Sequence, residues 1–207
     1  VLSAEIRSEE LFQRVFINYY KPEDPKEKLS EKIDTYCNAL IGLSETYDSP
    51  IIFYNMYLVW MYRFEMMHEY KNMLEICNNA EKYIEDNPTY YQDDKLATFQ
   101  LKKMSAYLHL KNFEKGRVNA EKCLESFPKG SNFWFQFMEY YLLLALHTGN
   151  MAQAIAIYGR AAGNTKFKRQ DTEFKTRWQI YDVYLNYIIE SQGDKNSVLK
   201  ASKRKSF

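Results

Sequence analysis

Glycine and proline are scarce, with 7 and 5 in a chain of 207 residues. A protein of many short strands would need more of both at its turns, so a sheet fold is not expected. Cysteine is scarce too. Its three copies, Cys37, Cys77 and Cys123, are odd in number and form no Cys-X-X-Cys motif. This argues against a disulfide framework or a zinc knuckle and predicts buried thiols on helices.

Long apolar segments are also missing. The longest, Met56–Tyr62 and Tyr140–Leu146, have seven residues each, well short of the ~20 that a membrane-spanning helix needs. Charged residues such as Glu5 and Arg7 lie near the start, where a signal peptide would be apolar. We therefore expect no membrane association and a cytoplasmic location.

Charge of one sign is not in excess. The chain has 28 Lys and Arg against 27 Asp and Glu, a net charge of +1. A protein that binds nucleic acid usually presents a basic face that displaces counterions from phosphates. The two basic segments, residues 166–170 and 200–205, are short and lack a neighbouring stacking platform. We expect a solvated loop and a frayed tail there, and no nucleic-acid partner.

An internal repeat is present instead. Glu69–Pro88 and His109–Pro128 align at an offset of 40 residues without a gap and are identical at 8 of 20 positions. Chance would give about one or two identities, so we take the repeat as real. Each copy is predicted to be a helix that ends at its proline. An apolar 3.6-residue period predicts a preceding helix for each, over Ile51–Met67 and Asp93–Leu110.

The same alternation of helix and short polar turn extends along the chain. Turns are expected near residues 68–72, 111–112, 148–150 and 191–194. Further helices are predicted over Ser3–Tyr20, Lys26–Tyr47, Phe133–His147, Met151–Ala162 and Asp171–Glu190, with Ser131 and Asp171 as N-caps. Gly149 is expected in a left-handed turn conformation. The prediction is an all-α fold of helix pairs, one domain over residues 1–207 divided at 1–49, 50–90, 91–130, 131–165 and 166–207.

Small residues recur at fixed places in the second helices. An aromatic or apolar residue at the turn is followed after three residues by a small one, after seven more by another, and then by proline. The matching residues are Asn112–Phe113, Gly116, Cys123 and Pro128; Gly149–Asn150–Met151, Ala154 and Ala161; Met73, Ile76, Tyr83 and Pro88, with two oversized residues; and Gly193–Asp194 and Val198.

This pattern resembles the tetratricopeptide repeat, although the spacing here is 40 residues rather than about 34. The resemblance implies a right-handed α-α superhelix, a solenoid in which Ala154 and Ala161 lie where helices approach closely. It also implies a concave side, built by the first helices of the pairs, that holds a peptide or a partner protein.

Motifs for catalysis or cofactors are absent from the sequence. No glycine-rich phosphate loop or Gly-X-Ser-X-Gly occurs, and Glu9–Glu10 is interpreted as a solvated helix face. His68, His109 and His147 lie near the ends of successive first helices. They could form a metal or pH-sensing column, but helix axes about 10 Å apart are too distant to share one ion, so the helix dipole is the favoured explanation. We expect no enzyme activity, cofactor or metal.

Aromatic residues are abundant, with 18 Tyr, 13 Phe and 3 Trp. Within Ile51–Met67, a 3.6-residue period places Tyr57, Trp60 and Phe64 on one face. Tyr54 lies at the edge of that face and Tyr62 points away from it. We expect one of these sets in the core and the other on the inner surface. The predicted partner-binding residues are Tyr54, Tyr62, Gln136, Glu139 and Tyr187.

Three functions compete on these observations. The leading one is a non-enzymatic scaffold that binds a peptide or partner protein. The alternatives are a regulatory or sensory segment of a longer chain, and an enzyme with the groove as its pocket. The helix over Asp171–Glu190 is apolar on more than one side. We therefore expect the chain to continue past Phe207 or a second copy to cover this helix, unless lysine stems of residues 200–205 cap it.

Overall fold

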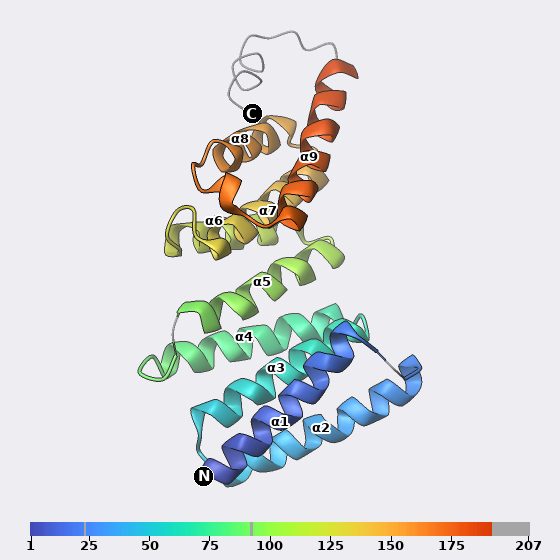
Figure 1. The fold of residues 1–207 in the computed structure, drawn as a ribbon, viewed down its shortest axis with the longest axis vertical. Helices are drawn as coiled ribbons and strands as arrows, with labels where there is room; N and C mark the ends of the chain where they lie inside the picture. The colour runs from blue at the N-terminus through green and yellow to red at the C-terminus, as the bar shows by residue number, and fades with distance from the viewer. Residues whose placement is uncertain (23, 92, 192–207) are drawn as a thin grey trace. The chain divides into compact units, whose positions relative to one another are not determined.

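The computed structural model describes residues 1–22, 24–91 and 93–191, and every regular element within these ranges is a helix (Figure 1). The all-α prediction is confirmed. The chain divides into two compact units, of which the first is Val1–Leu110 and the second begins at Lys111. The expected second half of the last helix pair, at Gly193–Asp194 and Val198, and the basic segment 200–205 lie outside the described residues.

The first unit contains five helices. They are α1 (Leu2–Tyr20), α2 (Lys26–Thr46), α3 (Pro50–Met66), α4 (Tyr70–Asp86) and α5 (Asp93–His109). Each contacts the next, and α1 also contacts α3, so α3 is covered by α1, α2 and α4. This explains why α3 carries apolar residues on several faces. Buried side chains at its centre include Leu11, Ile33, Leu40, Val59, Met61, Met73 and Cys77.

The second unit contains α6 (Phe113–Ser126), α7 (Asn132–His147), α8 (Met151–Ala162), the short 3-10 helix η1 (Phe167–Arg169) and α9 (Thr172–Ser191). Consecutive α-helices again pack on one another. Both predicted N-caps are confirmed. Ser131 Oγ accepts a hydrogen bond from the backbone N–H of Trp134 at 3.2 Å, and Asp171 Oδ1 accepts one from Phe174 at 2.7 Å.

Three turns between helices share one backbone geometry. Three residues separate α3 from α4, α5 from α6, and α7 from α8. The middle residue of each has a positive φ: 59° at His68, 57° at Lys111 and 72° at Gly149. The turns predicted near residues 68–72, 111–112 and 148–150 are confirmed, and so is the left-handed conformation of Gly149. The turn predicted near 191–194 extends outside the described residues. Histidine and lysine adopt this conformation at a cost of roughly 1–2 kcal/mol, which glycine avoids.

The small residues of the second helices face the core. Ala154 and Ala161 on α8, predicted to lie where helices approach closely, are fully buried. In the first unit, the predicted alignment of α4 with the small-residue pattern of the second helices is wrong. Tyr70 begins α4 as Phe113 begins α6, so Met73 and Ala80 occupy the equivalent positions, and both are fully buried. Ile76 and Tyr83, predicted for these positions, are only half-buried. The reason is length, since α4 has 17 residues and α6 has 14.

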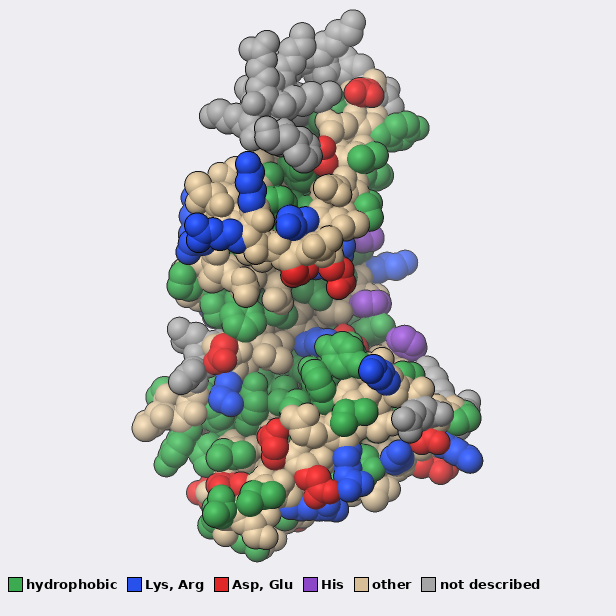
Figure 2. All heavy atoms as spheres, in the orientation of Figure 1, with side chains coloured by type: hydrophobic (Ala, Val, Ile, Leu, Met, Phe, Trp, Pro, Cys, Tyr) green, Lys and Arg blue, Asp and Glu red, His purple; other side chains and the backbone are tan. Residues whose placement is uncertain are grey.

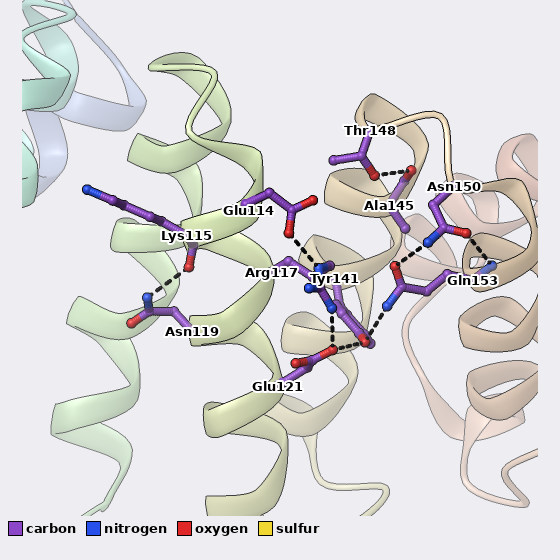
Figure 3. Close-up of polar contacts among 10 residues, drawn as sticks. All are labelled: Glu114, Lys115, Arg117, Asn119, Glu121, Tyr141, Ala145, Thr148, Asn150 and Gln153. Atoms are coloured by element: carbon purple, nitrogen blue, oxygen red, sulfur yellow. Dashed lines mark hydrogen bonds and ion pairs between the residues drawn. The ribbon is translucent and has the colours of Figure 1, made fainter.

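A polar network connects the three helices α6, α7 and α8 (Figure 3). Arg117 on α6 donates to Glu121 Oε1 at 2.9 Å. Tyr141 on α7 donates to the same oxygen and accepts from Gln153 Nε2 on α8 at 2.7 Å. Burial, and next the hydrogen bond to Glu121, raise the pKa of the Tyr141 phenol. The tyrosine therefore stays a neutral donor that fixes the register of the three helices.

Candidate functional site

The five predicted partner-binding residues fall on three separate surfaces. Tyr54 and Tyr62 line a cavity in the first unit. Gln136 and Glu139 line a cavity in the second unit. Tyr187 lies on the outward side of α9. The sequence alone could not show the two cavities, because each combines residues from different helices.

The cavity of the first unit has a volume of about 670 Å³ and is called here the tyrosine cavity. Its walls come from α1, α3, α5 and the segment before α5, and none of the lining residues belongs to α2 or α4. Among these residues are Glu5, Glu9, Tyr54, Tyr62, Tyr90, Tyr91 and Lys95. On the face shown in Figure 2, hydrophobic side chains gather over α3 and toward α5.

Asn55 joins the acidic and aromatic sides of this cavity. It lies on α3, is only 3% exposed, and donates to Ser8 Oγ at 3.0 Å and to Glu9 Oε2 at 3.2 Å, both on α1. Ser49, just before α3, donates to Glu5 Oε1 at 2.7 Å. These bonds hold both α1 carboxylates at the cavity. Glu9 is exposed, as predicted for a solvated face, and it is also part of the cavity lining.

The aromatic side of the cavity is fixed by hydrogen bonds and ring contacts. Tyr91 donates to the backbone oxygen of Pro50 at 2.7 Å, and the Tyr54 ring meets Phe99 edge-on with centroids 5.7 Å apart. Burial raises the pKa of Tyr54 to about 12; a hydrogen bond with Thr98 opposes this, and the negative charges of Asp94 and Glu9 add to it. The phenol is therefore neutral at physiological pH.

A lysine already uses one aromatic face. The ammonium of Lys95 lies 4.3 Å from the centroid of the Tyr54 ring, the geometry of a cation–π contact.

Tyr62 has a different environment from the one predicted. It is 7% exposed and does not point into open space. Its ring packs on those of Phe16 and Tyr19 of α1, with centroids 5.9 and 4.8 Å away. The prediction treated α3 as having one covered face, but α1 covers the other. Tyr62 thus forms the floor of the cavity rather than its rim.

The cavity of the second unit has a volume of about 570 Å³, and we call it the Glu139 cavity. It lies between α7 and α9 and includes Arg169, Gln170 and Asp171, while no residue of α8 lines it. Gln136 is exposed, and its polar side chain is open to a ligand. Glu139 is 8% exposed and accepts from Arg177 Nε at 2.6 Å, from Arg177 Nη2 at 3.0 Å and from Tyr181 at 2.8 Å.

This bidentate pair determines what Glu139 can do. Both carboxylate oxygens are engaged, so the side chain serves as a fixed part of the wall. The hydrogen bond with Glu139, against the opposing effect of burial, raises the pKa of the Arg177 guanidinium. Burial and then Glu139 raise the pKa of Tyr181. The pair and the phenol together form a rigid, hydrogen-bonded side of the cavity.

The third surface is the outward side of α9. Four apolar residues are strongly exposed there: Ile180 at 62%, Val183 at 69%, Tyr184 at 48% and Tyr187 at 69%. They are spaced three and four residues apart and share one helix face. Phe174, Trp178 and Leu185 of α9 are buried instead. We call this surface the α9 outer face.

Sequence patterns missed several of the residues that complete these surfaces. Glu5 and Glu9 are four residues apart, a spacing that places them on one helix face with Phe12; that spacing could have signalled a shared role. Nothing in the sequence pairs Arg177 with Glu139. In the described part of the chain, no group of three or more His, Cys, Asp or Glu residues could hold a metal ion. Nor does any helix described there combine the length and apolarity of a membrane span.

Comparisons of the chain with protein-family models, with curated proteins and with solved structures return no match.

Proposed function

We propose that this protein is a non-enzymatic scaffold that binds a peptide or partner protein with its first helices, which are α1, α3 and α5 in the first unit and α7 and α9 in the second. One observation carries the proposal. The tyrosine cavity and the Glu139 cavity are lined by first helices and their adjoining segments, and by none of the second helices α2, α4, α6 and α8. In each unit the cavity therefore lies on first helices, where a helical repeat that binds a partner presents its contacts.

The chemistry of the cavities suits binding. Each combines aromatic rings with a few fixed polar groups, the composition typical of recognition sites. Tyrosine supplies a large, rigid contact area with a polar tip. Glu139 is engaged on both oxygens, which favours a role in recognition over one in proton transfer.

The proposal includes the tetratricopeptide-like arrangement expected from the sequence, a right-handed superhelix of helix pairs. Small-angle X-ray scattering of the full chain tests this part. An elongated, curved particle is expected, and a scattering profile of a compact sphere would contradict it.

Selection from a random peptide library on the full chain tests the binding function. Peptides selected on the native protein should bind at least about fivefold more weakly to Tyr54→Ala or Gln136→Ala, since these changes remove first-helix contacts. Asn78→Ala on α4 and Glu125→Ala on α6 are exposed second-helix controls and should bind normally. The proposal would be overturned if the selected peptides bound more weakly only to Asn78→Ala or Glu125→Ala and bound normally to Tyr54→Ala and Gln136→Ala.

The α9 outer face supports a further part of the proposal, association of two copies through the C-terminal unit. Four strongly exposed apolar side chains on one helix face favour burial against a partner surface. Light scattering should give a dimer mass for the native chain and a monomer mass for Val183→Lys combined with Tyr187→Lys. A native monomer would refute the association.

A further inference from the structure

We propose that the tyrosine cavity binds an arginine side chain of the partner peptide. This inference rests on the proposed scaffold function and names the chemistry that one of its cavities recognises. It starts from the charge on α1. Glu5 and Glu9 lie four residues apart, and their carboxylates accept hydrogen bonds from the neutral groups of Ser49, Asn55 and Gln13.

These two carboxylates differ from their neighbour. Glu10 is held by two arginines, Arg7 at 2.5 Å and Arg14 at 2.6 Å, so its charge is compensated on the helix surface. Among the described residues, neither Glu5 nor Glu9 takes part in an ion pair of this kind, while both line the cavity. The acidic side of the cavity is therefore organised by neutral donors and retains its attraction for a cation.

The opposite side of the cavity offers aromatic faces. Lys95 shows that a cation is accepted there, since its ammonium lies 4.3 Å from the Tyr54 centroid. The ring of Tyr90 is 66% exposed at the cavity and available for stacking. Negative charge on one side and aromatic faces on the other attract the same ligand, a cation, because the face of an aromatic ring also has a negative electrostatic potential.

Arginine fits this pair of walls better than lysine. Its guanidinium is planar, stacks on aromatic rings and presents several N–H donors in a fixed fork. Glu5 and Glu9, one helical turn apart, can accept from such a fork, and charge-assisted bonds of this type are the stronger ones. The volume of about 670 Å³ lies within the range of ligand pockets, so a long side chain can enter.

Lys95 then acts as an internal competitor. Its positive charge lies at the cavity without forming an ion pair with Glu5 or Glu9, and this charge repels a second cation. Its replacement should strengthen binding of arginine. A residue with a purely structural role would not produce a gain of affinity when it is removed.

The test uses the full chain and two small probes, N-acetyl-arginine amide and N-acetyl-citrulline amide, followed by NMR titration of backbone amides. Citrulline has nearly the same shape and no charge. The arginine probe should shift the amides of Glu5, Glu9 and Tyr54 and bind roughly tenfold or more tightly than the citrulline probe. Equal binding of the two probes would overturn the inference.

Variants make the test specific. Glu5→Gln with Glu9→Gln keeps the acceptor oxygens for Ser49 and Asn55 and should weaken arginine binding roughly tenfold or more. Glu31→Gln with Glu45→Gln, two exposed positions on α2, removes the same charge elsewhere and should leave binding unchanged. Equal loss in both double variants would contradict the inference.

Lys95→Met tests the effect in the opposite direction, since it should raise the affinity for arginine rather than lower it. It should tighten binding of the arginine probe at least about threefold. If the Glu5 and Glu9 double variant loses its helical circular dichroism, this variant decides, and unchanged affinity for arginine then overturns the inference.

The peptide selection separates this inference from the scaffold function. Arginine-rich peptides that depend on Tyr54 and on the two carboxylates support both. Peptides without arginine or lysine that still depend on Tyr54 leave the scaffold standing and refute the arginine inference. Peptides that bind independently of both cavities refute the scaffold function itself.

Discussion

The imidazole of His109 lies flat against the ring of Tyr70, with centroids 3.9 Å apart and planes inclined by 12°. His147 and Phe113 repeat the relationship at 5.0 Å and 10°. In both pairs the aromatic residue begins a second helix, and the histidine ends the next first helix. The histidines thus fasten successive helices together, α4 to α5 and α6 to α7, at positions where the helix dipole also favours them.

The first prediction concerns this stacking. A double-mutant cycle with His109→Ala and Tyr70→Ala should give a coupling of about 0.5–1.5 kcal/mol, the usual range for aromatic pairs. The free energy of unfolding of all four proteins is measured by urea denaturation. The Phe113–His147 cycle offers an independent repeat in the second unit. Additive losses in both cycles would show that the stacking contributes nothing.

The second prediction concerns the small residues of α8. Ala161 is fully buried, so Ala161→Leu should overpack its contact and lower the free energy of unfolding by roughly 1–3 kcal/mol. Ala156 lies on the same helix and is exposed, so Ala156→Leu should change stability little. Urea midpoints distinguish the two variants. Coinciding midpoints for Ala161→Leu and the native chain would contradict close packing at this helix.

The third prediction concerns the bidentate pair. Arg177→Met leaves Glu139, only 8% exposed, without its cation and should destabilise the protein by about 1–3 kcal/mol. Combining it with Glu139→Leu should cost less than the sum of the two single changes, because no uncompensated charge stays buried. Thermal and urea unfolding of the three variants measure this. A double variant as unstable as the sum would argue that the pair acts through independent contacts.

The fourth prediction concerns alkaline pH. The pKa of Tyr54 is raised to about 12 by burial, against about 10 in an unfolded chain. The stability associated with the neutral phenol is fully present below pH 10. Between about pH 10 and 12 the unfolded chain ionises first, so the free energy of unfolding falls as pH rises.

Tyr54→Phe removes this ionisable group and should make the alkaline fall shallower, measured as the urea midpoint against pH. Tyr90→Phe alters an exposed ring and serves as the matched control. The same slope in the native chain and in Tyr54→Phe would exclude Tyr54 as a contributor.

Much of the fold was predictable from local signals. Caps at Ser131 and Asp171 and the glycine at position 149 are short-range features, and the structure confirms them. The register of α4 was not predictable in the same way. Displacing a helix by three residues is close to one turn of 3.6, so apolar residues coincide nearly as well in the wrong register as in the right one. Only the position of the turn, set by His68, separates the two.

The candidate surfaces were predictable only in part. Tyr54 and Gln136 are recognisable as residues at the edge of an apolar face, and the structure places both at cavities. The hydrogen bond between Asn55 and Glu9 and the burial of Tyr62 were not predictable, because helix periodicity describes one helix at a time. Contacts between α1 and α3 join residues more than 40 positions apart, as between Ser8 and Asn55, and no local pattern encodes them.

The bridge formed by Asn55 has a thermodynamic consequence. It attaches the carboxylate of Glu9 on α1 to the wall formed by α3, so the cavity is complete only while α1 is docked. A ligand that needs both walls must therefore lower the population of the state in which α1 is detached, by linkage between occupancy and partial unfolding. Amide hydrogen exchange along α1 would then decrease with ligand concentration, which makes the first helix a reporter of binding without any added label.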